Sequence, residues 1–482
     1  MAYRYGHRYQ IGLLPQSIEQ YVAEGDPVRA YDAFVEALDF NELGIDINPN
    51  KVGNSTYDPK AMLKLLVYGY SYGIKSSRKL ERETHHNISF IWLMGGLKPD
   101  HKTIAEFRRK NKKTIEKVLK QCARLCIKLN LIAGNTFFVD GSKIRANASA
   151  SRTHEKAWYE EQLKDIDLRI AQLMQECEAI DEQEQHLSSF VAMGKELSQA
   201  QTLKSSIKKA LAEFKDTARK KINQTDPDCA NMRSIQGKHA SYNVQTVVDD
   251  KNGLIVHAEA LNDVNDLNQF ARQIKQANEV LQKPCEVACA DAGYADTEEL
   301  EKIDAKGIKV IVPSHQQASG DGKKPFSKQQ FSYDKEHDCY YCPKGHELRL
   351  KQTWGKTGNK YYQITEKQLC HNCQHWGICT TGKTGRRIVR LDNEEIKEKL
   401  EVQYEQKQSK EIYARRKSRV EHPFGHIKRN LKTDAFLMRG RDGALAETSL
   451  LATCFNMARM ITIMGVSGLI EKLTLKAAPA TG

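Results

Sequence analysis

Three acidic residues stand where divalent cations could be held. Asp140 ends the apolar run TFFVD, Asp291 follows the run VACA, and Glu421 lies in the helical stretch YARRKSRVEHPFGHIKRN. Acids at the ends of neighbouring strands, together with one from a covering helix, can converge on a pair of Mg²⁺ ions, because hard cations prefer carboxylate oxygens. Such ions can activate a water molecule on one side and stabilise a leaving 3′ oxygen on the other. The three residues therefore predict phosphodiester chemistry.

The surroundings of Glu421 are strongly basic. Between Lys410 and Arg441 there are ten lysines and arginines but three acids. A single acid is most often a surface carboxylate or a helix cap, but one placed among cations suits a site where phosphates and metal ions meet. Pro423 predicts that the helix kinks or restarts beside Glu421.

Five cysteines gather in a short segment: Cys339, Cys342, Cys370, Cys373 and Cys379. In a reducing compartment such bunching indicates a metal site and not disulfides. Two Cys-x-x-Cys pairs separated by 27 residues are typical of a zinc ribbon, in which four thiolates hold one structural ion. Spacing alone favours the two pairs and leaves Cys379 out. Unmetallated thiols are the alternative.

The acids are embedded in alternating strand and helix patterns. Further strand-like runs are SYNVQTVVD, GLIVHAEAL, EVACADAG and IKVIVP, and a helix-like segment separates the second from the third. The turn sequence Asp-Lys-Asn-Gly joins the first two runs as a hairpin would. We therefore expect a mixed α/β sheet that includes TFFVD.

A long helical segment, residues 155–221, interrupts this sheet. Its first apolar series is spaced alternately by three and four, which is typical of a heptad seam: Leu163, Ile166, Ile170, Leu173, Cys177 and Ile180. A second series predicts a returning helix and hence a helical hairpin. Residues 155–196 hold eleven acids and four bases, so the pattern favours a structural or dimerising role over DNA binding.

The first 130 residues are predicted to be helical. Pro59 follows Asp58 and would occupy the first position of a helix. Thr103 and Glu106 match a capping box and predict a helix that runs to about Asn130. Residues 101–130 carry ten lysines and arginines against two glutamates, so this helix either presents a solvated face or contacts DNA.

The composition of the 482-residue chain is that of a globular protein with about three structural units. Its net charge of +13 favours a polyanionic partner, because phosphate contacts release counterions. The first residues lack the apolar core of a signal peptide, and the apolar stretch 448–470 is interrupted by Asn456 and Arg459. We expect a cytoplasmic protein with no membrane contact.

Several sequence blocks, taken in order, resemble the DDE transposases of bacterial insertion sequences. They are YDPKAMLKLLVYGYSYGIKSSRKLE, IWLMGG with PDHKTIAEFRR, VDGSKIRANAS, YNVQTVVD, ADAGYAD and RRKSRVEHPFGHIKRN. The resemblance covers roughly residues 15–465 and points to the eleven-eighty-two family in the wider insertion-sequence-four group.

This resemblance implies an RNase H-like catalytic core in which Asp140, Asp291 and Glu421 hold two Mg²⁺ or Mn²⁺ ions. It implies cleavage at the 3′ ends of the element and strand transfer into target DNA, in related enzymes often through a hairpin on the excised ends. It also favours a particular set of ligands for a structural Zn²⁺, with Cys339 as the alternative: Cys342, Cys370, Cys373 and Cys379.

The wider group carries a Tyr, Arg, Glu, Lys signature on its final helix. Lys428 matches the lysine, seven residues after Glu421, and is expected to contact phosphate as a point charge. The arginine position is Lys417 here, with Arg416 adjacent, and Tyr413 lies one residue further out than the pattern expects. The residues expected to contact DNA are Lys428, Arg416, Lys417, Arg419, Arg429, Arg439 and Arg441.

The predicted fold is an α/β RNase H-like core with insertions. Its parts are a helical DNA-binding region (1–130), the first part of the core (131–335) with a coiled-coil arm (151–225), a zinc ribbon (336–382), the second part of the core (383–470) and a tail (471–482). The predicted function is cut-and-paste transposition by a homodimer on terminal inverted repeats and target DNA. The alternatives are a transposase-derived DNA-binding protein that no longer cuts, and a structure-specific nuclease of the same fold.

Overall fold

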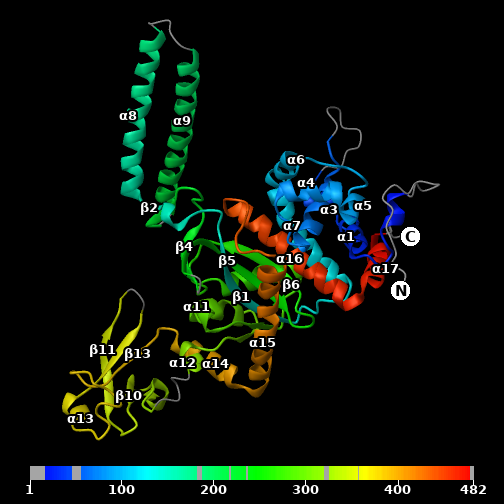
Figure 1. Ribbon diagram of the computed structural model, residues 1–482. Coiled ribbons are helices and arrows are strands. Elements are labelled where there is room, and N and C mark those ends of the chain that lie inside the picture. The colour runs from blue at the N-terminus through cyan, green and yellow to red at the C-terminus, as the bar shows by residue number, and fades with distance from the viewer. Residues whose placement is uncertain are drawn as a thin grey trace, which may run out of the picture.

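The computed structural model describes residues 17–45, 56–181, 187–216, 219–234, 237–319, 325–355 and 358–477. A mixed sheet lies at its centre beside a group of N-terminal helices, and a helical hairpin and a small β subdomain project from it (Figure 1). The predicted α/β class is confirmed. Residues 478–482 of the predicted tail lie outside the described part.

Six strands form the central sheet: β1 (Thr136–Arg145), β4 (Ala230–Ser234), β5 (Gly237–Asp249), β6 (Ile255–Leu261), β7 (Val287–Cys289) and β8 (Lys309–Ile311). They follow the order β4-β5-β1-β7-β8, and β6 also pairs with β5. β1 runs antiparallel to β5 and parallel to β7, and β7 runs parallel to β8. The strand-like runs of the sequence thus form one mixed sheet, as predicted.

One stretch of β1 has an open edge. On the side away from β5, β7 pairs only with residues 136–138, and Arg145 bridges to Ala435. Between these contacts no strand of the described residues pairs with this edge at Asp140 and Gly141. We call this stretch the β1 notch.

Within residues 17–45 and 56–130, the N-terminal region contains seven α-helices: α1 (Pro27–Glu36), α2 (Phe40–Leu43), α3 (Pro59–Ser71), α4 (Ser77–His86), α5 (Ile88–Leu93), α6 (His101–Lys110) and α7 (Lys112–Lys128). Pro59 does begin α3, and the Asp58 side chain accepts a hydrogen bond from the Lys60 amide. The predicted start at Thr103 is wrong, because Asp100 caps α6 by accepting from the Thr103 amide. Asn111 separates α6 from α7, so two helices replace the predicted one.

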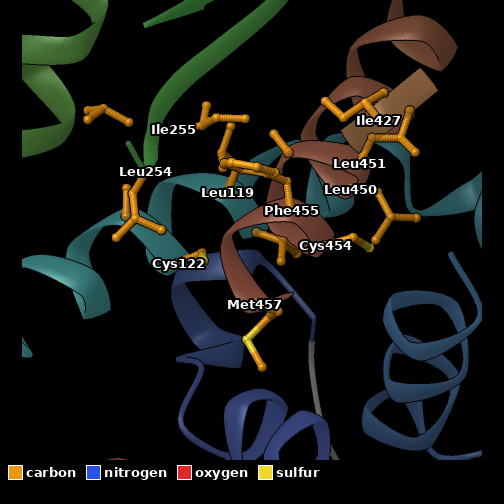
Figure 2. Packing of buried hydrophobic residues seen from close by; sticks show 14 of the residues in the cluster. Leu119, Cys122, Leu254, Ile255, Ile427, Leu450, Leu451, Cys454, Phe455 and Met457 are labelled. Atoms are coloured by element: carbon orange, nitrogen blue, oxygen red, sulfur yellow. The ribbon is translucent and has the colours of Figure 1, made fainter. Parts of the chain in front are cut away.

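Further helices are α10 (Phe270–Leu281), α11 (Thr297–Asp304), α12 (His315–Ser319), α14 (Glu394–Glu405), α15 (Lys407–Gly425), α16 (Arg441–Met464) and α17 (Val466–Ala477). Of these, α10, α11, α14, α15 and α16 pack against strands of the sheet, whereas α17 packs against α1 and α16. In the core, α16 packs against α7, α3 and β6. Figure 2 shows side chains of this core, among them Leu119, Cys122, Leu254, Ile255, Ile427, Phe455 and Met457. The N-terminal helices and the sheet therefore share one hydrophobic core.

A buried acid on α16 ties this core together. Glu447 is fully buried, and its Oε2 accepts hydrogen bonds from the amides of Leu437 (2.8 Å) and Met438 (3.1 Å). Its Oε1 accepts from the hydroxyl of Tyr70 on α3 at 3.3 Å, and that hydroxyl accepts from Arg108 Nη1 of α6 at 2.8 Å. Burial raises the pKa of Glu447. The network joins the N-terminal helices to the segment after α15.

Within the described residues, no single helix is both long and apolar enough to cross a membrane. The helices Arg441–Met464 and Val466–Leu475 are long and apolar enough only when taken together, and the chain bends by 106° between them.

The predicted helical hairpin is present. It consists of α8 (Lys156–Asp181) and α9 (Leu187–Asp216), and the short strands β2 (Thr153–Glu155) and β3 (Lys221–Asn223) pair at its base (Figure 1). A separate small core of Tyr159, Ile207, Ala210 and Ile222 lies near this base. The side chains of Cys177 and Ile180 in the predicted seam lie outside the described residues, and packing as a coiled coil stays a prediction.

The cysteine-rich segment forms its own subdomain. Five antiparallel strands follow the order β13-β12-β11-β10-β9: β9 (Ser332–Asp334), β10 (Cys339–Tyr341), β11 (Glu347–Thr353), β12 (Lys360–Ile364) and β13 (Arg387–Arg390), with a short helix α13 (Lys367–His371). Tyr340, Leu348, Tyr362 and Ile388 are buried in its core. The sheet extends on both sides of the predicted segment 336–382, because β9 and β13 are part of it.

Candidate active site

The sheet brings Asp140 and Asp291 to the β1 notch. The residues just before Asp140 in β1 are apolar and buried, and Asp140 itself pairs across the sheet with Thr246 of β5. Asp291 comes two residues after Cys289, the last residue of the neighbouring strand β7. It caps a short turn, and its Oδ1 accepts a hydrogen bond from the Gly293 amide at 2.8 Å. The parallel strands β1 and β7 thus bring the two carboxylates to one place. Asp291 follows the end of its strand, as predicted, but the prediction that Asp140 ends a strand is wrong, because β1 continues to Arg145 by pairing with β5.

Arg416 of α15 bridges the two carboxylates. Its Nη1 lies 3.3 Å from Asp140 Oδ1, and its Nη2 lies 3.6 Å from Asp291 Oδ2. The Arg416 side chain is 14% exposed and its guanidinium lies over the Tyr413 ring, 5.7 Å from the centroid. A cation between two carboxylates offsets their mutual repulsion.

The carboxyl group of Asp140 has a raised pKa. Burial raises the pKa of Asp140 to about 6, with smaller increases from Asp291 and Asp266, while Arg416 opposes the rise. The Asp140 side chain is 20% exposed. A raised carboxyl pKa in a partly open site is typical of functional positions, although structural networks also cause it.

Lys428 also faces this site. α15 continues through Pro423 to Gly425 and is followed by one π turn, His426–Asn430. The Lys428 Nζ donates a hydrogen bond to Ser142 Oγ at 2.6 Å, and burial lowers the pKa of Lys428. Ser142 lies two residues after Asp140 on β1, so both side chains point to the same face of the strand.

Glu421 is not part of this cluster. It lies on α15, its side chain is 64% exposed, and the nearest ion-pair partner is Lys417 Nζ at 4.0 Å. Across the described ranges, no three His, Cys, Asp or Glu side chains are arranged to hold a metal ion. The structure therefore brings two of the three predicted acids together and leaves the third on the helix surface.

The other basic residues predicted at DNA fall into two groups. Arg419 pairs with Asp250 at 3.3 Å, and Arg441 pairs with Glu259 at 3.4 Å, so both hold elements of the fold together. Lys417, Arg429 and Arg439 are exposed, as is Arg441, and Arg439 donates to the Asn147 carbonyl at 3.1 Å.

Sequence reasoning missed Asp266, in the loop between β6 and α10. Its Oδ1 accepts hydrogen bonds from Asn243 Nδ2 and Gln245 Nε2, both at 2.7 Å. Asn243 and Gln245 are buried amides on β5. Polar residues at alternate positions of an otherwise apolar strand were the signal that something polar faces them.

A basic groove lies beside these acids. Its volume is about 410 Å³, and Ser142, Asp266 and Lys428 line it. Its further cationic lining residues are Lys143, Arg145 and Arg233. A groove with this charge suits a phosphate backbone.

Four cysteines of the small subdomain lie around one cavity, although their thiols are not arranged to hold a metal ion in this structure. Cys342, Cys370, Cys373 and Cys379 line one cavity of about 30 Å³. Burial raises the pKa of Cys379, and the other three thiols add to the rise. Cys339 is not in this lining; it is buried on β10, paired across the sheet with Asp334 and Arg349.

Comparisons with known proteins bear on these residues. Two family models match the chain: "Transposase domain (DUF772)" over residues 16–110 and "Transposase DDE domain" over residues 341–461. No curated protein matches it. A piggyBac transposase synaptic complex with hairpin DNA, solved by cryo-electron microscopy, matches with a TM-score of 0.35 and 8% identity, over 94% of this chain and 79% of that chain. A score this low carries no argument about fold or function.

The first matched segment spans helices α1 to α6, and the second contains Arg416, Glu421 and Lys428. With a transposase domain and a transposase DDE domain in one polypeptide, this chain is a DNA transposase of the DDE type.

Proposed function

We propose that this transposase cuts the ends of a bacterial insertion sequence and joins them to target DNA, as a member of the eleven-eighty-two family. The observation that carries the proposal is the pair of carboxylates, Asp140 and Asp291, held at the β1 notch with Arg416 between them. Asp140, Asp291 and Glu421 are the proposed catalytic acids.

The proposed core is RNase H-like. In its support, β6, β5 and β1 form an antiparallel set, and β7 and β8 continue from β1 in parallel. Along the chain, Asp140 lies within the first of these five strands and Asp291 follows the fourth, and the helix that carries Glu421 packs over β1.

The acids at the notch fit Mg²⁺ or Mn²⁺. Carboxylate oxygens are the ligands these ions prefer, and two acids beside each other leave an excess of negative charge that a cation offsets. In this structure Arg416 supplies that positive charge. Bound ions would activate the attacking oxygen and stabilise the leaving one. Glu421 would join the two aspartates through movement of its exposed side chain and of α15.

DNA is the proposed partner at the groove. Lys428 would hold a phosphate next to Ser142, and the exposed Lys417, Arg429 and Arg439 would extend the contact along the backbone. Since both element ends must be processed together, a homodimer on DNA is expected, and the α8–α9 hairpin is the proposed dimerising arm. The N-terminal helices are proposed to contribute to DNA binding.

Zn²⁺ is the proposed structural ion of the small subdomain. The four cysteines that share its cavity are the ligand set that the family resemblance favours. Four thiolates leave no open coordination position, so the ion would stabilise the fold and take no part in catalysis.

Measuring the zinc content of variants should show which of the five cysteines bind the ion. Purified protein should carry about one zinc per chain, and Cys379→Ser should lose it, because three thiolates hold the ion less tightly. Cys339→Ser is the matched control and should keep the metal. Elemental analysis of the three proteins checks this; zinc retained by Cys379→Ser and lost by Cys339→Ser would show that Cys339, and not Cys379, is the fourth ligand.

The raised pKa of Asp140 predicts a pH dependence of cleavage. A metal ion binds the ionised carboxylate, so protons compete with it below the pKa of about 6. At subsaturating Mg²⁺ we expect the cleavage rate to fall by up to about tenfold for each pH unit below that pKa. A rate profile that stays flat through this range would show that Asp140 does not titrate in the reaction.

The proposed function is tested by incubating the protein with DNA that carries its own element ends and Mg²⁺, and mapping the cuts. Cuts at the 3′ ends followed by joining to a target plasmid support it. Cutting without end specificity or joining would point to the nuclease alternative. Binding without cutting, in Mg²⁺ and in Mn²⁺, would point to the DNA-binding alternative.

A further inference from the structure

Asp266 approaches the β1 notch from the side opposite to Asp140. Successive residues of a strand point to opposite faces, and Asp266 lies over Gly141, the residue after Asp140. The edge of β1 is open at these two residues, so carboxylates on the two faces flank one gap in the sheet. Asp266 is close enough to Asp140 to raise its pKa.

Gly141 makes room for this arrangement. A Cβ on Gly141 would lie 2.8 Å from Asp266 Oδ1 and 2.4 Å from Gln245 Nε2, both closer than real Cβ contacts. Any side chain at this position would therefore push the Asp266 carboxylate away from β1. The glycine forms a cradle for a carboxylate beside the notch.

The orientation of Asp266 is fixed through one oxygen only. Oδ1 accepts from the two buried amides of Asn243 and Gln245, and the Tyr294 hydroxyl in turn donates to Gln245 Oε1. Oδ2 has no hydrogen-bond or ion-pair partner among the described residues. It lies 3.9 Å from the position of a Cβ on Gly293, whose amide donates to Asp291 Oδ1.

We propose that Asp266 is a further metal-binding residue of the active site, whose free Oδ2 contacts the divalent cation held by Asp140 and Asp291. The inference rests on the proposed function, which assigns a metal ion to that pair. The three carboxylates do not form a metal site in the ion-free arrangement described here. Asp266 is flanked by exposed residues, Asn265 and Leu267, so its loop has room to close on an ion.

The test is Mn²⁺ binding to the full-length, zinc-loaded protein without DNA, measured by titration calorimetry. Asp266→Asn should weaken Mn²⁺ binding by at least about tenfold, because an amide oxygen replaces a charged ligand. The variant keeps an oxygen for Asn243 and Gln245, and equal thermal unfolding midpoints in buffer without Mn²⁺ would show that it is folded.

Asp263→Asn is the matched control. Asp263 lies in the same loop, is exposed and accepts from Gln269 Nε2 at 3.1 Å, so its variant should bind Mn²⁺ as the wild type does. If Asp140→Asn loses Mn²⁺ binding and Asp266→Asn does not, the inference is overturned and the proposed function stands. If Asp140→Asn also binds Mn²⁺ as tightly as the wild type, the proposed metal site itself is wrong.

Discussion

Replacing Asp140 by asparagine is expected to lower the rate of DNA cleavage by at least about 10³-fold. The variant keeps the size of the side chain but removes the negative charge that faces Arg416 at 3.3 Å and that would bind a metal ion. Affinity for element-end DNA should stay within about threefold of the wild type, because Asp140 repels phosphate rather than binding it. Cleavage of labelled end DNA and a gel-shift titration measure the two quantities.

Glu298→Gln is the control for this experiment. Glu298 is an exposed acid on α11, so its variant has the same loss of charge away from the notch. Its cleavage rate should equal that of the wild type. An Asp140→Asn variant that nicks end DNA as fast as Glu298→Gln would show that the catalytic assignment is wrong.

Replacing Glu447 by alanine is expected to lower the free energy of unfolding by about 3–5 kcal/mol. The change leaves the amides of Leu437 and Met438 without their acceptor and removes the acceptor of the Tyr70 hydroxyl. It also removes a negative charge that interacts with Arg108, which donates to that hydroxyl. Chemical denaturation followed by circular dichroism measures the effect.

The matched variant is Glu447→Gln, which keeps an acceptor oxygen and should lose about 1–2 kcal/mol. Both variants remove the negative charge, but only Glu447→Ala leaves the two backbone amides without an acceptor. The difference between their free energies of unfolding therefore gives the cost of the unsatisfied amides. Equal denaturation midpoints for Glu447→Ala and the wild type would mean that this network does not stabilise the contact between the N-terminal helices and α16.

The sequence predicted those parts of the site that depend on local patterns. Apolar runs with β texture became β1, β5, β6, β7 and β8, and Asp140 and Asp291 lie at the notch because β1 and β7 run parallel beside each other. The helix start at Thr103 was wrong because Asp100, three residues earlier, also matches the capping preference and satisfies the Thr103 amide.

What depends on distant parts of the chain was not predictable in this way. The position of Glu421 depends on how α15 is rotated over the sheet, and the inward face of this helix belongs to Arg416 and Val420. Asp266 lies in a loop without periodicity, and only the buried amides of Asn243 and Gln245 connect it to the site. The small subdomain extends beyond its predicted end at residue 382 because β13 pairs with β12 across a long loop.

The pairing of β2 with β3 has a practical consequence. Glu155 stands directly opposite Lys221, so the chain leaves toward the tip of the hairpin and returns at adjacent points. Lengthening or trimming α8 and α9 together would leave the pairing of β2 with β3 intact, so the rest of the fold would not have to move. The hairpin tip is therefore a suitable place to graft a fluorescent reporter or an affinity handle on the enzyme.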